Sequence, residues 1–187
     1  MRLTSIIMLI VLSFGVVGYA VAVYGLLPLG AAVHPDMRAT FEAHDRLGIY
    51  THVFASAFAL ALGPFQFAAR LRSTHPALHR WSGRLYLGLG VLVGGIAGLF
   101  VAFNAFGGPV ARVGFMCLAV AWLFSGCKAY LSIRSRDVAS HRRWMVRNFA
   151  LTFAPLRSGF GCRAWLYPAY RWRLPIRQSP GSAGCPM

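Results

Sequence analysis

The sequence predicts an all-α integral membrane protein with about four transmembrane helices, and three observations lead to this class. The chain of 187 residues is 57% hydrophobic and has a mean hydropathy of +0.57. Only 12% of its residues are charged, whereas soluble proteins carry about 25%. Four apolar runs are each close to the roughly 20 residues that cross a bilayer. The lipid bilayer is therefore the first partner that the sequence predicts.

The predicted elements follow one another closely along the chain. The apolar runs occupy about 4–27, 48–69, 85–106 and 110–131, and a truncated fifth helix covers about 144–154. The first run is long for a signal peptide and has no clean small-residue cleavage site, so we expect it to stay as a helix. Residues 1–154 form the predicted multi-pass transmembrane domain.

The segment 155–187 has a different character. From residue 156 onward it contains five Arg, four Pro, four Gly, two Cys and two Trp, with no acidic residue and no periodic pattern. One interpretation is a disordered basic tail. The other, which we favour, is out-of-frame translation, because a chain so rich in arginine and poor in lysine suggests GC-rich DNA. Neither interpretation predicts a membrane-spanning helix there.

The net charge of +15 does not predict a nucleic-acid partner, because the basic residues flank the apolar runs, where arginine side chains reach the membrane interface. The link after the second run and the segment after the fourth are rich in arginine, whereas the link after the first run carries three acidic residues. The positive-inside rule then places the N-terminus and both arginine-rich segments in the cytoplasm.

The two arginine-rich segments repeat one pattern. Both contain Arg-Ser, five residues, then His-Arg, with a Trp within two residues. This spacing predicts two tandem hairpin-like repeats related by an axis along the membrane normal. The equivalent residues are Arg72 and Arg134, Ser73 and Ser135, His79 and His141, and Arg80 and Arg142.

The repeat gives the histidines a hypothetical role. A near two-fold axis would bring His79 and His141 face to face at the inner membrane surface, where two imidazoles hold a haem iron from both sides. Arg80 and Arg142 would then pair with the haem propionates. Two alternatives stay open: these residues are interfacial anchors, or the arginines bind anionic lipid.

Other polar residues lie inside the apolar runs. His52 lies near the outer end of the second run, where an ionisable residue is a functional candidate. It could share a helix face with His44 and bind a second haem, a metal or a quinone, or it could be a hydrogen-bonded structural histidine. Gln66 is expected to bond to a neighbouring helix. Gly90, Gly94 and Gly98 form a four-residue spacing that predicts close helix packing, with a planar cofactor as the alternative.

Several motifs resemble a known family. In order they are Gly63-Pro64-Phe65-Gln66-Phe67, His79-Arg80-Trp81-Ser82-Gly83-Arg84, His141-Arg142-Arg143-Trp144-Met145 and Asn148-Phe149-Ala150-Leu151. Together they are similar to the predicted bacterial membrane proteins described as domain of unknown function 2306. The resemblance covers about residues 45–154. It implies a multi-helix inner-membrane protein whose last motif runs into a full helix, and this chain departs from that pattern after Ala154.

The resemblance carries no established activity. Its histidines at helix ends are similar, in architecture alone, to b-type cytochromes and ferric reductases. The sequence therefore predicts an uncharacterised integral membrane protein without enzymatic activity. One alternative is a haem-binding electron-transfer protein, with haem b as its cofactor and His79, His141, His52, Arg80 and Arg142 as site residues. The other is a small transporter or channel subunit, with His52 and Gln66 on a polar path. A second copy or another membrane protein would be its partner.

Overall fold

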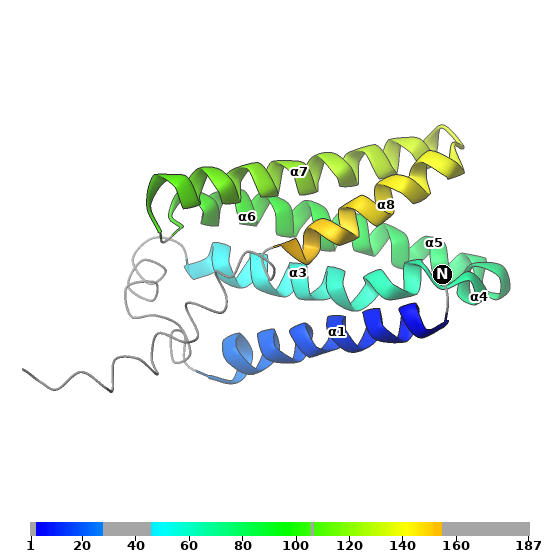
Figure 1. Cartoon of the computed structure of the whole chain (residues 1–187), viewed down its shortest axis with the longest axis horizontal. Coiled ribbons are helices and arrows are strands. Elements are labelled where there is room, and N and C mark those ends of the chain that lie inside the picture. Colours follow the sequence, from blue (N-terminus) through cyan, green and yellow to red (C-terminus); the bar gives the residue numbers. More distant parts are fainter. Residues whose placement is uncertain (1–2, 28–45, 106, 155–187) are drawn as a thin grey trace, which may run out of the picture.

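The computed structural model describes residues 3–27, 46–105 and 107–154. Within them the chain forms a bundle of antiparallel helices whose long axes lie roughly side by side (Figure 1). The tail 155–187 and the acidic link that contains His34 and His44 lie outside the described residues. The predictions made for those segments therefore stay predictions.

Four helical spans are long and apolar enough to cross a membrane. The first consists of α1 (Leu3–Val21) and the wide-turned η1 (Ala22–Leu26), and the second is α3 (Arg46–Gln66). The third joins α5 (Pro76–Leu85), η2 (Tyr86–Val93) and α6 (Gly94–Phe103), and the fourth is α7 (Gly108–Arg134). The sequence prediction of four spans is confirmed, and many large apolar side chains on these helices are exposed, as expected for surfaces that face lipid.

The links between the spans are more helical than the sequence predicted. The segment between the second and third apolar runs forms α4 (Ala69–Thr74) and α5, so the third span begins nine residues before the apolar run. Pro76 occupies the first turn of α5, where its missing N–H costs no hydrogen bond. The fifth helix, α8 (Val138–Thr152), begins at Val138 and not at Trp144, because Asp137 caps it by accepting from the Ser140 backbone N–H at 2.9 Å.

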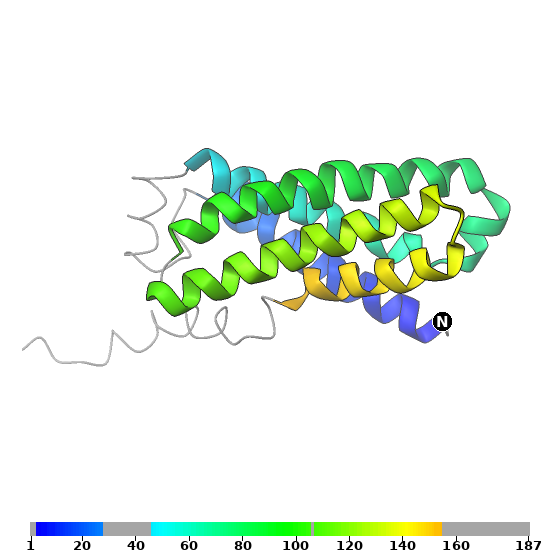
Figure 2. The same ribbon diagram turned by 90° about the horizontal axis from the view of Figure 1, so that it is seen from above.

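Four of the helical units close into a ring. The α3 helix packs on η2 and α6, α6 packs on α7, α7 packs on α8, and α8 returns to α3, while α1 lies against the outer side of α3. Figure 2 shows α7 and α8 lying next to each other as an antiparallel hairpin. The ring buries a core of Ala59, Leu60, Tyr86, Val91, Trp122, Ala129, Met145 and Phe149.

The glycine stripe predicted in the third run is covered by α3. A Cβ at Gly90 would meet Ala59, one at Gly94 would meet Ala55 and Ser56, and one at Gly98 would meet His52. These close approaches confirm the prediction of helix packing. The alternative of a flat face for a planar cofactor is wrong at this position, because α3 occupies it.

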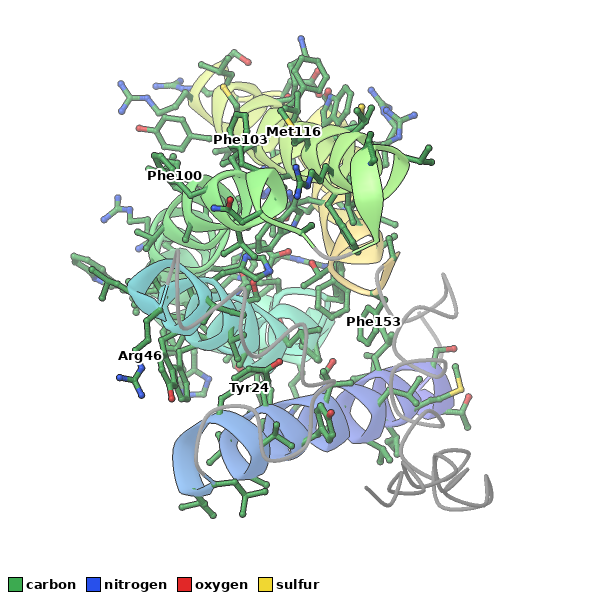
Figure 3. The ribbon with its side chains drawn as sticks, turned by 90° about the vertical axis from the view of Figure 1, so that its left-hand side faces the viewer. Tyr24, Arg46, Phe100, Phe103, Met116 and Phe153 are labelled. Atoms are coloured by element: carbon green, nitrogen blue, oxygen red, sulfur yellow. The ribbon has the colours of Figure 1, made fainter. Side chains whose placement is uncertain are left out.

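The helices also follow the repeat that the sequence motif predicted. The α3 helix begins at Arg46 and α7 at Gly108, while α5 begins at Pro76 and α8 at Val138, and both pairs of starts are 62 residues apart, the separation of Tyr86 from Asn148. The N-terminus, α4 and the α7–α8 turn lie at one end of the bundle (Figure 1). The opposite end, where α3 and α7 begin, is seen in Figure 3, with Arg46 at its edge and Phe100 pointing away from α6.

Candidate functional site

The two motif histidines occupy the same position in their helices. The backbone N–H of His79 donates to the carbonyl of His75, the residue that precedes α5, at 3.1 Å. The backbone N–H of His141 donates in the same way to the carbonyl of Asp137, the residue that precedes α8, at 3.0 Å. Each histidine therefore lies in the first turn of its helix, and both helices begin at the same end of the bundle.

A buried polar contact shows how these two helices face each other. The hydroxyl of Tyr86 donates to Oδ1 of Asn148 at 2.7 Å, and both side chains are fully buried. Each of these residues follows its motif histidine by seven positions, and seven residues make almost two full helical turns. His79 therefore shares a face with Tyr86, and His141 shares a face with Asn148.

The two motif histidines are also alike in their exposure. Both imidazoles are half-buried, whereas Arg80 and Arg142, which follow the histidines in the chain, are exposed. Each motif therefore places a half-buried imidazole next to an exposed guanidinium. The pairing of His79 with His141 around one ligand stays a prediction.

The hydrogen bonds of the two imidazoles differ. Nδ1 of His141 lies 2.8 Å from the carbonyl oxygen of Ala129 on α7. Because a carbonyl oxygen only accepts, Nδ1 is the donor in this bond, and Nε2 is the ring nitrogen that stays available for another partner. Nδ1 of His79 is buried and has no hydrogen-bond partner among the described residues. A buried nitrogen without a partner is unfavourable, so this position calls for a group that satisfies it.

Asn148, which accepts the hydrogen bond from Tyr86, is also bonded to α7. Its Nδ2 donates to the carbonyl oxygen of Trp122 and to Oγ of Ser125, both at 2.8 Å, and Ser125 donates to the Trp122 carbonyl at 2.9 Å. All four polar groups of this network are satisfied inside an apolar bundle, where such networks fix one arrangement of helices. Sequence reasoning missed Tyr86 and Asn148. The signal was present, because extending the 62-residue offset by seven positions from the histidines pairs these two residues.

His52 does not belong to the same site. Its Nδ1 lies 2.8 Å from the carbonyl oxygen of Gly94, and its ring packs against the backbone of Gly98 on α6. Gly94 follows His79 by fifteen residues along one continuous span, which corresponds to about 22 Å of helical rise. His52 therefore lies far from the His79–His141 pair, at another depth in the bundle. Its predicted companion His44 lies outside the described residues.

His52 and Gln66, the two residues of the possible transport path, both form hydrogen bonds to neighbouring helices. Nε2 of Gln66 donates to Oγ of Ser82 at 2.8 Å, which confirms the expected bond to a neighbouring helix. His52 is likewise bonded to a neighbouring helix. Both side chains of the proposed path are thus engaged in helix packing, and nothing in the described part of the chain favours the transporter alternative.

Comparison with known proteins identifies one relationship. A family model described as predicted membrane protein (DUF2306) matches residues 49–168. This range covers more than half of the chain, includes both histidine motifs, and continues beyond the described residues. No curated protein and no solved structure matches the chain. With four candidate spans and this match, the chain is an integral membrane protein that belongs to the DUF2306 family.

Proposed function

We propose that this protein binds haem b, whose iron His79 and His141 would hold, and that it transfers electrons in the membrane. The observation that carries the proposal is the pairing of equivalent residues. Tyr86 and Asn148 are bonded across the two repeats, and the histidines stand in the same register seven residues earlier. In the proposed arrangement the two imidazoles would hold the haem iron together, as histidine ligands do in haem proteins.

The chemistry of the donors supports the same assignment. An imidazole that ligates iron commonly donates its other N–H to a backbone carbonyl, which fixes the tautomer and raises the basicity of the ligating nitrogen. His141 makes such a bond to Ala129. His79 has a buried ring nitrogen that lacks a partner among the described residues. A bound haem supplies a one-electron carrier, and the role of this chain is to hold and orient it.

The arginines next to the histidines support the binding of the carboxylates. Haem carries two propionates, and a guanidinium binds a carboxylate by charge-assisted hydrogen bonds. Arg80 and Arg142 are exposed and lie one residue beyond each histidine. Asp137 is the only acidic residue in the described ranges, and its carboxylate accepts from the Ser140 N–H. These arginines are therefore free to bind an anionic ligand.

We further propose that the protein lies in the cytoplasmic membrane of a bacterium with its N-terminus in the cytoplasm. The N-terminus and both arginine-rich links lie at one end of the bundle (Figure 1), and the positive-inside rule assigns that end to the cytoplasm. Electron transfer needs a donor and an acceptor, so a second copy or another membrane protein is the partner that the proposal implies.

The absorption spectrum of the purified full-length protein, made in cells supplied with a haem precursor, tests the proposal. We expect narrow bands on reduction in the wild type. His79→Ala and His141→Ala should each lose most of the haem, while Arg80→Gln and Arg142→Gln should lose part of it, since each arginine contributes one charge-assisted contact of about 1.5–3 kcal/mol.

His75→Ala is the matched control. His75 lies in the same link, is exposed and bonds through Nδ1 to Thr74 at 2.8 Å, so its loss should leave the haem content unchanged. Far-UV circular dichroism checks that each variant keeps its helices. A correctly folded wild type that is colourless after haem supplementation contradicts the proposal, and so do histidine variants that keep the full spectrum.

A further inference from the structure

A cationic cluster lies on the outer side of the α7–α8 hairpin, away from the histidine pair. It consists of Lys128 on α7 and Arg143 and Arg147 on α8, all with exposed side chains. Arg143 and Arg147 are four residues apart, so they share one face of α8. We name this set, together with Trp144, the hairpin cluster.

Side-chain contacts fix the position of the cluster between the two helices. The hydroxyl of Ser132 donates to Oγ of Ser140 at 3.3 Å, and the rings of Phe124 and Trp144 meet edge to face with centroids 5.8 Å apart. Lys128 lies one turn from Ser132 and one turn from Phe124 on α7. It therefore lies opposite the segment from Ser140 to Trp144, on the side of the hairpin that these contacts define.

Trp144 is the centre of the cluster. The guanidinium of Arg147 lies over its ring, 4.7 Å from the ring centroid, which is the geometry of a cation–π contact. Phe124 supports the ring from α7. An arginine stacked in this way keeps its N–H groups free to bind an anion while its flat face covers apolar surface.

The charge of the cluster has no protein counterpart in the described residues. Asp137 is their only carboxylate, and it caps α8 through the Ser140 N–H. Arg147 also lies ten residues inside α8 from Asp137, about 15 Å along the helix, next to the exposed apolar residue Val146. Among the described residues Arg147 therefore has exposed apolar surface beside it and no carboxylate within reach.

We infer that the hairpin cluster binds the phosphodiester headgroup of an anionic phospholipid. Lys128, Arg143 and Arg147 bind the phosphate oxygens, while the acyl chains lie along the exposed apolar side chains of Val120 and Val146, both 55% exposed. The apolar surface next to the cations favours a lipid over a free phosphate ion, because a soluble anion gains nothing from it. This inference does not depend on haem binding.

Spin-labelled lipids test the inference on the full-length protein in vesicles. The relative association constant of phosphatidylglycerol over phosphatidylcholine is measured from the motionally restricted fraction. A membrane-surface cation contributes roughly a fivefold preference for an anionic lipid. We expect the wild type to prefer phosphatidylglycerol clearly over phosphatidylcholine. In the double variant Lys128→Gln/Arg147→Gln, which removes two such cations, the relative association constant at the cluster should fall roughly twentyfold or more.

The matched control is Arg70→Gln/Arg72→Gln, which removes the same charge from exposed positions on α4 at the same end of the bundle. The control should lose much less of the preference than the Lys128/Arg147 variant, because its two cations do not belong to the hairpin cluster. If both double variants lose it equally, net charge explains the effect and the inference is overturned. It is also overturned if the Lys128/Arg147 variant keeps the preference, or if millimolar inorganic phosphate abolishes it in the wild type, since the cluster would then bind a free anion.

Discussion

The close contact between η2 and α3 allows a sharp test of the packing, through the substitution Gly90→Ala. A Cβ at Gly90 would lie 2.7 Å from the Cβ of Ala59, 3.1 Å from its Cα and 3.3 Å from its backbone nitrogen. Ala59 is fully buried in the middle of α3. No side-chain rotation can relieve the clash, so the two helices must separate.

The expected magnitude follows from two opposing effects. Inserting a methyl group into a packed core costs typically about 1–3 kcal/mol. Replacing glycine by alanine within a helix gains about 0.5–1 kcal/mol. Gly88→Ala provides the second effect alone, because a Cβ at Gly88 meets nothing within 4 Å and Gly88 lies in the same helix. The difference between the two variants should therefore be about 1–3 kcal/mol.

The assay is reversible unfolding of both variants in mixed detergent micelles, followed by far-UV circular dichroism. Gly88→Ala should match or exceed the wild type in free energy of unfolding, and Gly90→Ala should fall below both. Equal stability of the two alanine variants would refute the reasoning, because it would mean that η2 does not approach the α3 backbone.

Three further predictions concern α8, the buried polar pair and the topology. Asp137→Ala should destabilise the protein by about 0.5–2 kcal/mol, because it removes the cap of α8. Asp137→Asn should be tolerated, since asparagine caps a helix equally well. Thermal unfolding of the two variants distinguishes the loss of the cap from the loss of the charge. Tyr86→Phe should lower the free energy of unfolding by about 0.5–1.5 kcal/mol through loss of the bond to Asn148, and the exposed Tyr130→Phe should change it little; equal effects would contradict a buried hydrogen bond. The topology is tested by cysteine labelling in a chain whose natural cysteines are replaced. Cysteines at Ser73 and Ser135 should react only with a reagent on the cytoplasmic side, whereas a cysteine at Val110, which is 86% exposed at the other end, should react only with a reagent on the outer side. Labelling of Ser73 and Val110 from the same side would refute the topology.

The apolar runs alone were sufficient to predict the four spans, because crossing a bilayer requires about 20 apolar residues whatever the neighbouring helices are. The sequence also indicated the repeat, since the 62-residue offset between the histidine motifs recurs in the starts of α3 and α7 and of α5 and α8. The equivalent positions of His79 and His141 in the first turns of α5 and α8 could be predicted for the same reason. The residue pattern is sufficient to predict a feature when the physical requirement for that feature is local or is repeated along the chain.

The tertiary structure decided the remaining features. Hydropathy recognises only apolar segments, so it placed the starts of α5 and α8 too late, where amphipathic turns with arginines extend the helices beyond the membrane core. Only the folded structure could show which group forms a hydrogen bond with His52, because the carbonyl of Gly94 lies 42 residues away along the chain. Tyr86 and Asn148 likewise look unremarkable in isolation. A buried polar group must find its hydrogen bonds wherever the packing of the helices brings a partner, and that choice depends on the whole bundle and not on the local sequence.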